Sequence, residues 1–103
     1  MERIEQLKKF LEANPTDSFL KHALALEYIK LGDDVKGKEL FEELLAVDPG
    51  YVGSYYHLGK LFERNADNDK AIEWYQKGMQ VAKEKGEQHA FGELRGAWEE
   101  LTF

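Results

Sequence analysis

The chain repeats itself at a spacing of 34 residues, which is the distance between its two prolines, Pro15 and Pro49. Sliding the sequence over itself by this offset places small residues on small ones and aromatic residues on aromatic ones. The matched pairs are Leu24 with Leu58, Ala25 with Gly59, Tyr28 with Phe62, Gly37 with Ala71 and Phe41 with Tyr75. A fixed offset of this length predicts an array of helical repeats in which each unit stacks on its neighbour.

Within the first unit the apolar residues recur every three or four positions, which is the period of an amphipathic helix. One such stripe runs over 19–29 and a second over 35–47. Asp17 or Ser18 can cap the start of the first helix with a side-chain oxygen. Gly32 can take a positive φ at its end. The unit is therefore predicted to be a pair of helices joined by a short turn.

The second unit follows the same plan, and amphipathic stripes continue on both sides of the two units. Helices are expected over about 52–64 and 69–85, with Gly86 as a C-terminal cap. The stripes outside the units predict flanking helices that close off the two ends of the core, at residues 2–13 and 87–102. The total is six helices, and no segment has the alternation of a strand.

A chain of 103 residues is long enough for one domain and too short for two independent cores. We therefore expect a single all-α domain over residues 1–103. Its first repeat is predicted at 18–51 and its second at 52–85, between the two flanking helices.

Composition excludes several classes of function. Fourteen basic and 20 acidic residues give a formal charge of −6, which lacks the positive field that nucleic acid binding requires. Cysteine is absent, so disulfides, thiolate nucleophiles and cysteine-bound zinc are excluded. No apolar run approaches the ~20 residues of a membrane span, and the charged start MERIEQLKKF does not resemble a secretory leader. We expect a cytoplasmic protein that engages neither membranes nor nucleic acid.

The second unit carries an aromatic residue, then Leu-Gly, then an aromatic, followed by a small and an aromatic residue in its second helix: Tyr55, Leu58, Gly59, Phe62, Ala71 and Tyr75. This order resembles the signature of the tetratricopeptide repeat family. The first unit matches less closely, because Lys21 replaces the first aromatic residue, while Pro49 stands where the family's proline belongs. The chain is also similar to small stand-alone bacterial proteins of this class. The resemblance implies an α-hairpin solenoid of about six antiparallel helices in a short right-handed superhelix.

In this family the first helix of each repeat lines a concave surface that binds extended or helical peptides. Carried over by position, the resemblance implies a groove lined by Phe19, His22, Leu26, Ile29, Lys30, Gly53, Tyr56, Lys60, Glu63, Arg64, Ala90, Leu94 and Trp98. Lys60 and Arg64 would lie four residues apart on one face, where they can hold a carboxylate of the partner.

Part of this set has a second interpretation. A hydrophobic stripe does not distinguish core from groove. Three residues can therefore be assigned to the core or to the groove: Leu26, Ile29 and Leu94. Lys60 and Arg64 can equally be solvated charges paired with acidic neighbours, which contribute little energy. Tyr56 is the stronger candidate, because Tyr55 occupies the signature core position and its neighbour points elsewhere around the helix.

Other ligands are not expected. The Lys-and-Asn clamp with which some repeats of this family grip a C-terminal carboxylate is absent, because His22, Leu26 and His57 stand at its positions. The histidines His22, His57 and His89 recur at nearly the repeat period, but their offsets of 35 and 32 residues rotate the side chains relative to one another. No His-x-x-x-His pair is present either, so no metal site is predicted.

No catalytic signature is present. The chain lacks the phosphate-binding Gly-x-x-x-x-Gly-Lys-Ser/Thr motif, and its hydroxyl residues have no recognisable base. We therefore expect a non-enzymatic scaffold without a cofactor, which binds a protein or peptide through the groove. The alternative is a homodimeric assembly module, in which C-terminal side chains that do not fold back form an apolar patch for a second copy: Trp98, Leu101 and Phe103.

Overall fold

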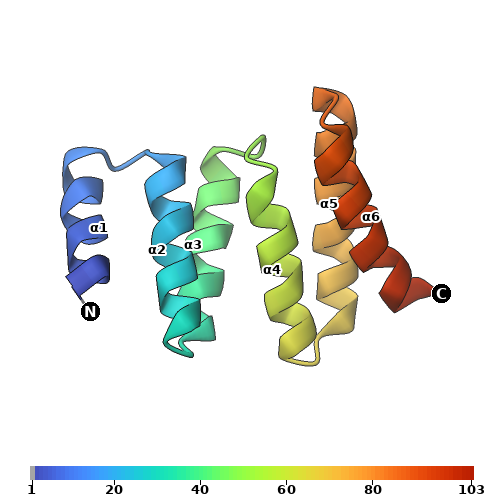
Figure 1. Ribbon diagram of the computed structural model, residues 1–103, viewed down its shortest axis with the longest axis horizontal. Coiled ribbons are helices and arrows are strands. Elements are labelled where there is room, and N and C mark those ends of the chain that lie inside the picture. The colour runs from blue at the N-terminus through green and yellow to red at the C-terminus, as the bar shows by residue number, and fades with distance from the viewer. Residues whose placement is uncertain (1) are drawn as a thin grey trace. The chain divides into compact units, whose positions relative to one another are not determined.

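The computed structural model describes residues 2–103, and this part of the chain forms six α-helices and no strand. The predicted all-α fold is confirmed. The helices are α1 (Glu2–Ala13), α2 (Ser18–Lys30), α3 (Asp34–Val47), α4 (Gly53–Arg64), α5 (Asn68–Lys85) and α6 (Gln88–Thr102) (Figure 1). They belong to two compact units, unit 1 over Met1–Asp48 and unit 2 over Pro49–Phe103. None of the six has the length and apolar content that a bilayer span demands.

Aspartates cap the starts of three helices. The side chain of Asp17 accepts a hydrogen bond from the backbone N–H of Leu20 at 3.0 Å, which decides between the two predicted caps, Asp17 and Ser18. Asp33 and Asp67, which are 34 residues apart, cap α3 and α5 in the same way at 3.1 and 3.3 Å. Each carboxylate oxygen satisfies a backbone N–H that has no partner within its own helix.

The turns within the two helix pairs share one geometry although their sequences differ. Gly32 takes a positive φ of 84° after α2, as predicted, and Ala66, 34 residues later, takes 62° after α4. In both turns the N–H of the next aspartate donates to a carbonyl inside the preceding helix, at 2.9 and 2.8 Å. Gly86 ends α5 in the same left-handed conformation. A Cβ makes this conformation cost about 1 kcal/mol, so Ala66 carries a strain that both glycines avoid.

Unit 1 packs its three helices in the order of the chain. α2 lies antiparallel beside α3, and α1 lies against α2 (Figure 1). Ile4 and Leu7 of α1 meet Leu24 and Tyr28 of α2 in a buried cluster. Burial of these apolar side chains is the force that holds α1 on the first helix pair.

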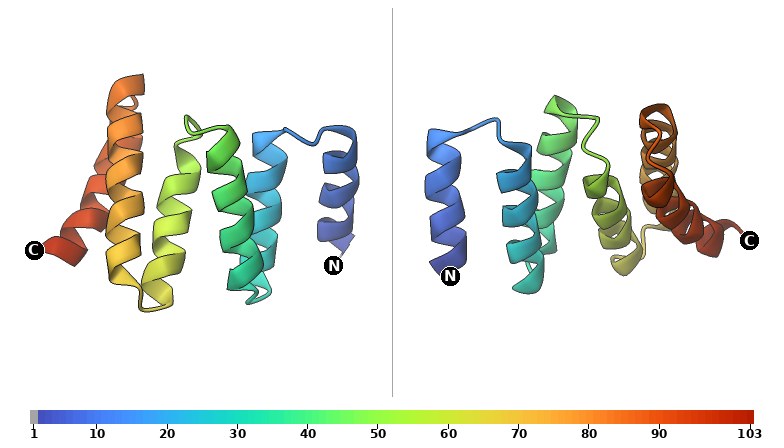
Figure 2. Two further views of the ribbon diagram at one scale, coloured as in Figure 1. Left: turned by 180° about the vertical axis from the view of Figure 1, so that it is seen from behind. Right: turned by 45° about the horizontal axis from the view of Figure 1, so that its top comes forward.

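In unit 2, α5 packs against both α4 and α6, and α6 crosses α5 obliquely (Figure 2). All three helices contribute to the core, with buried side chains at Tyr55, Leu58, Phe62, Tyr75 and Leu94. Tyr55 keeps its polar end satisfied, because its Oη donates to the carbonyl oxygen of Pro49 at 2.6 Å. The signature residues of the second unit are therefore packing residues.

Gly59 allows the ring of Tyr75 to rest on the backbone of α4. A Cβ at position 59 would lie 2.6 Å from Tyr75 Cδ1 and 2.7 Å from its Cζ, distances at which atoms overlap. The ring cannot turn aside into solvent, since Tyr75 is completely buried. A glycine inside a helix costs about 1 kcal/mol relative to alanine, and this close contact offsets that cost.

The substitution Gly59→Ala is expected to lower the free energy of unfolding by about 1–3 kcal/mol, because the new methyl group overpacks the core. Urea denaturation measures the change. Gly92→Ala is the matched control, since a Cβ at this helical glycine of α6 meets nothing within 4 Å. The control should be neutral or stabilising by up to about 1 kcal/mol. Equal effects of the two substitutions would contradict the packing role of Gly59.

The substitution Ala66→Gly is expected to stabilise the fold by up to about 1 kcal/mol, because glycine takes the left-handed conformation without steric cost. The reverse change at the equivalent position, Gly32→Ala, should destabilise it by a similar amount. Both are measured as midpoints of thermal unfolding. A lower midpoint for Ala66→Gly would show that the turn is not strained.

Candidate functional site

The residues predicted for the groove on α2 differ in how much surface they offer. Phe19 is 63% exposed, and Lys30 is exposed with its Nζ 3.1 Å from a carboxylate one turn earlier in the helix. His22 and Leu26 are half-buried. The imidazole of His22 packs edge-on against the ring of Phe41, with 5.3 Å between ring centroids. His22 thus helps to join α2 to α3.

The expectation that Leu94 lines the groove is wrong. Its side chain is 1% exposed and packs against α5, where a Cβ at Gly78 would lie 3.0 Å from Leu94 Cδ1. A side chain with no exposed surface cannot contact a partner, so Leu94 belongs to the core. Ile29 also turns inward, because its Cγ1 lies 2.8 Å from the position of a Cβ at Gly37 of α3. Leu26 keeps part of its surface exposed.

The predicted residues of α4 are brought together with one residue of α5. Lys60 Nζ lies 5.5 Å from the centroid of the Tyr56 ring and 3.5 Å from Glu63 Oε2. The Tyr56 ring lies 6.3 Å from that of Tyr75, whose Oη donates to Glu63. We call these four residues the α4 cluster. The ion pair between Lys60 and Glu63 agrees with the second interpretation of Lys60, as a charge paired with an acidic neighbour.

Tyr75 remains a hydrogen-bond donor over the whole physiological pH range. Burial raises the pKa of its hydroxyl, and the hydrogen bond to the Glu63 carboxylate raises it further, because a phenolate beside a carboxylate is repelled. The negative charge of Glu100, on α6, acts in the same direction. The phenol therefore holds Glu63 in place and does not serve as a base.

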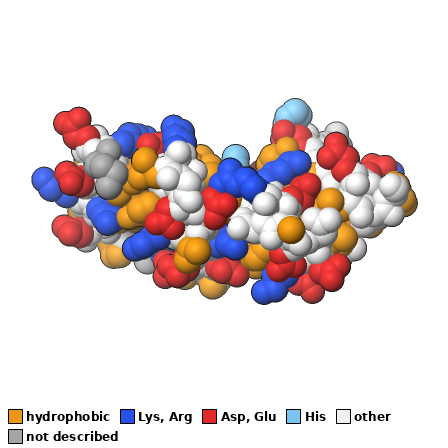
Figure 3. Space-filling view, turned by 90° about the horizontal axis from the view of Figure 1, so that it is seen from below, with side chains coloured by type: hydrophobic (Ala, Val, Ile, Leu, Met, Phe, Trp, Pro, Cys, Tyr) orange, Lys and Arg blue, Asp and Glu red, His pale blue; other side chains and the backbone are white. Residues whose placement is uncertain are grey.

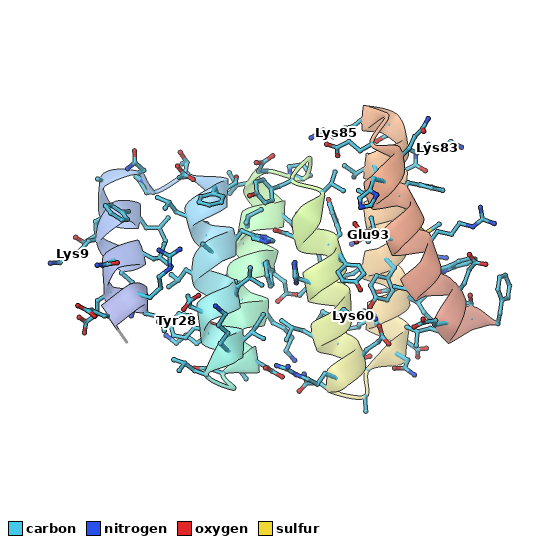
Figure 4. All side chains as sticks on the ribbon, in the orientation of Figure 1. Lys9, Tyr28, Lys60, Lys83, Lys85 and Glu93 are labelled. Atoms are coloured by element: carbon cyan, nitrogen blue, oxygen red, sulfur yellow. The ribbon has the colours of Figure 1, made fainter. Side chains whose placement is uncertain are left out.

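α6 presents acidic side chains toward the α4 cluster, and the sequence analysis did not select them. Burial lowers the pKa of His57 on α4, and the negative charge of Glu93 on α6 partly opposes this effect. Glu93 Oε1 also lies 3.5 Å from Nε2 of the exposed His89. Figure 4 shows Lys60 and Glu93 between α4 and α6. Glu93 and Glu100 are seven residues apart, which places them on one face of α6, two helical turns from each other. This spacing was the sequence signal from which the two residues could have been identified.

We call the surface formed by the α4 cluster with His57, Glu93 and Glu100 the α4–α6 face. Its chemistry is mixed, because it offers an aromatic ring, an ammonium group, three carboxylates and a buried phenol. Of the other predicted residues of unit 2, Gly53 and Arg64 are exposed and Ala90 is half-buried. Such an arrangement is suited to reversible binding through ion pairs and ring contacts.

The C-terminal aromatic residues fold back only in part. Trp98 and Leu101 are half-buried, whereas Phe103 is 89% exposed. The rings of Trp98 and Phe103 meet edge to face, with 5.8 Å between centroids. Within residues 2–103 the buried Nε1 of Trp98 has no hydrogen-bond acceptor. The same part of the chain holds no group of three or more His, Asp or Glu side chains arranged for a metal ion.

Comparison with known proteins places this geometry in context. A family model described as tetratricopeptide repeat matches residues 52–85. The crystal structure of a tetratricopeptide repeat domain protein from Salinibacter ruber is similar at 45% identity, with a TM-score of 0.79, over 84% of this chain and 96% of that chain. The solution structure of the same domain gives 46% identity and a TM-score of 0.81.

Longer proteins share only a segment with this chain. The mouse interferon-induced protein with tetratricopeptide repeats 3 is 26% identical over 76 residues, which are 74% of this chain and 19% of that protein. The mouse aspartyl/asparaginyl beta-hydroxylase is 27% identical over 74 residues, 72% of this chain and 10% of the hydroxylase. The chain thus spans a fifth or less of the length of these two relatives.

Acidification from about pH 7.5 to 5.5 is expected to destabilise unit 2 through His57. The unfolded chain takes up a proton near the ordinary histidine pKa of about 6.5, whereas the folded chain does so only at lower pH. Stability is therefore full above about pH 6.5 and falls as the pH drops below it. His57→Gln should reduce this loss in thermal unfolding. His89→Gln is the control, because its side chain is 94% exposed; equal pH profiles for both variants would contradict the assignment.

Proposed function

The chain belongs to the tetratricopeptide repeat family, and on this premise we propose that it is a non-enzymatic scaffold that binds a peptide or protein surface. The proposal includes the organisation expected from the sequence, with repeats at 18–51 and 52–85 between flanking helices at 2–13 and 87–102. The family match over 52–85 supports the second repeat. It also includes a bacterial source, which the likeness to the Salinibacter protein supports, and a cytoplasmic setting.

The observation that carries the proposal is the α4–α6 face. Lys60 is only 3.5 Å from Glu63 and remains 40% exposed, so it can exchange this pair for a carboxylate of a partner. An exposed ion pair contributes about 0–1 kcal/mol, so the exchange costs little. Tyr56 offers a half-buried ring whose neighbours hold it in place, and tyrosine is enriched among residues that dominate binding.

The charges of the face define the partner more closely. Lys60 suits an acidic side chain, while Glu93 and Glu100 on α6 suit a basic one. On the surface shown in Figure 3, basic and acidic side chains are likewise interspersed over each unit. We propose that the partner segment carries both signs of charge around an apolar residue that packs on Tyr56.

Further residues enter the proposal as secondary contacts. On α2 these are the predicted groove residues that keep exposed or half-exposed surface, and on α4 it is the arginine of the last turn: Phe19, His22, Leu26, Lys30 and Arg64. We propose no catalytic role for any of them. Ser54, the serine of α4, is completely buried, and the aligned segment of the hydroxylase is a tenth of that enzyme.

The test compares partner capture by the wild type and by the double variant Tyr56→Ala/Lys60→Glu. The bait is the immobilised protein, and the ligands are peptides selected from a random library. We expect the double variant to bind the selected peptides at least about tenfold more weakly than the wild type does. Lys9→Glu is the control, since it makes the same charge change on α1 at an exposed lysine (Figure 4). Equal affinity of all three proteins would contradict the proposal that peptides bind to the α4–α6 face.

The second candidate function is self-association through the C-terminal aromatic residues. The observation in its favour is Phe103, which exposes 89% of its surface beside Trp98. Large exposed apolar groups of this kind mark interaction surfaces when they gather with others. This function would be served by a surface other than the α4–α6 face.

A further inference from the structure

Two lysines from different helices of unit 1 converge on one tyrosine ring. Lys8 Nζ of α1 lies 5.8 Å from the centroid of the Tyr28 ring, and Lys36 Nζ of α3 lies 5.7 Å from it. Figure 4 labels Tyr28 on α2, the helix on which both α1 and α3 pack. Because both distances are measured from one ring, the two ammonium groups are no further apart than the sum of these distances.

Tyr28 holds the two lysines in place. Its ring is buried and is fixed in a cluster with Leu7 and Leu24. An ammonium group is attracted to the face of an aromatic ring. The Tyr28 hydroxyl also accepts a hydrogen bond from Lys8, and this bond raises the pKa of Lys8 because it favours the charged form. Groups that are positioned before a ligand arrives lose less conformational freedom on binding.

Neither ammonium group forms an ion pair within residues 2–103. The sequence offers Lys36 a carboxylate, because Glu39 follows it by three residues on the same helix. At the same spacing in α4, Lys60 pairs with Glu63 at 3.5 Å. The two lysines of unit 1 therefore keep their charges available for a carboxylate from outside the chain.

The two lysines border a hollow that a small acidic group can enter. Lys8, Tyr28 and Lys36 line this hollow of about 220 Å³ together with Leu24 and Leu40. The side chains of both lysines are exposed, so a ligand reaches the ammonium groups directly from solvent. A carboxylate can accept a charge-assisted hydrogen bond at each of its oxygens, at about 2.8 Å, and thus bridge two ammonium groups.

A second hollow of about 420 Å³ continues the first, because Lys8 and Leu40 line both. Its apolar residues also include Leu11 and Pro15, and Lys21 lies in its wall. We call the two hollows together the α1–α3 groove. A ligand that places a carboxylate between the two lysines can therefore pack a neighbouring apolar group on the leucines.

Carboxylates on the walls of the α1–α3 groove limit the charge that a ligand can carry. Glu39 and Glu43 line the first hollow, and Glu43 and Glu12 line the second. The negative charge of Glu5 also acts on Lys8. A polyanion such as a nucleic acid would bring further phosphates against these carboxylates. A single carboxylate between the two lysines meets opposite charge.

We propose that the α1–α3 groove binds a peptide segment through one acidic side chain. The carboxylate lies between Lys8 and Lys36, and an adjacent apolar residue of the peptide packs on Leu11 and Leu40. The groove belongs to unit 1 and shares no residue with the α4–α6 face, so this site is separate from the function proposed above.

The first test is an NMR titration of the full chain with the peptide acetyl-Leu-Glu-Leu-amide, whose side-chain carboxylate is its only charge. The ring signals of Tyr28 and the methyl signals of Leu40 should shift and saturate. Acetyl-Leu-Gln-Leu-amide is the matched neutral peptide. It should bind with a dissociation constant at least about threefold higher, as the loss of exposed ion pairs implies.

The second test repeats the titration with variants of the protein. Lys8→Gln/Lys36→Gln should raise the dissociation constant of the glutamate peptide at least about threefold. Both lysines are exposed, so the variant keeps the fold. Lys77→Gln is the matched control, because Lys77 Nζ lies 4.5 Å from the centroid of the Trp74 ring in unit 2. It should leave the dissociation constant unchanged.

Each other outcome overturns the α1–α3 groove as an acidic-peptide site. No saturation by the glutamate peptide up to about 10 mM does so, as do equal affinities for the two peptides or for the two variants. Inorganic phosphate that shifts the same signals at equal concentration would show an unselective anion site. Binding that Tyr56→Ala/Lys60→Glu abolishes and Lys8→Gln/Lys36→Gln retains would assign the peptide to the α4–α6 face, and so support the function proposed above.

Discussion

The contact between Gly59 and the ring of Tyr75 is the constraint on which unit 2 depends. Because the ring rests on the backbone of α4, its hydroxyl reaches Glu63, one turn further along the same helix. Glu63 then attracts Lys60, and the ammonium group of Lys60 lies over Tyr56. A larger residue at position 59 would move Tyr75 away from α4 and release Glu63. The packing of the helix pair and the arrangement of the binding groups are therefore one structural feature, in which a residue without a side chain sets the positions of four side chains.

The parts of the structure that depend on the order of residues along one helix could be predicted from the sequence. The repeat of 34 residues predicted the helix pairs, and the short polar residues before the first apolar stripe predicted a cap at Asp17 or Ser18, which the structure assigns to Asp17. The strain at Ala66 was missed because its sequence shows no glycine; only alignment with Gly32 at the repeat offset reveals the shared turn. Leu94 was assigned to either core or groove, since helical periodicity gives a stripe but not the side from which the next helix packs. Glu93 and Glu100 were missed for the same reason, as their role depends on how α6 crosses α5.

The residues of α6 depart from the 34-residue repeat period, and this departure affects how the helix can pack. Its aromatic and leucine residues follow those of α4 after 36 residues instead of 34, and Arg95 stands where the helix pair has Gly59. The arginine prevents the close approach that joins α4 to α5. Arg95 and Glu99 form an ion pair on the surface of α6, while Leu94 and Ala97 hold the other side of the helix in the core.

The two sides of α6 differ in the kind of partner that electrostatics allows. The side facing α4 carries Glu93 and Glu100, and their charges add to that of Glu63. A copy of this surface would bring three carboxylates against three carboxylates with one ammonium group on each side, which opposes self-recognition there. The opposite side of α6 carries Arg95 and Glu99, whose charges cancel in an ion pair, so this side adds no net charge that would repel a second copy. A partner of different chemistry and a second copy therefore need not compete for one surface.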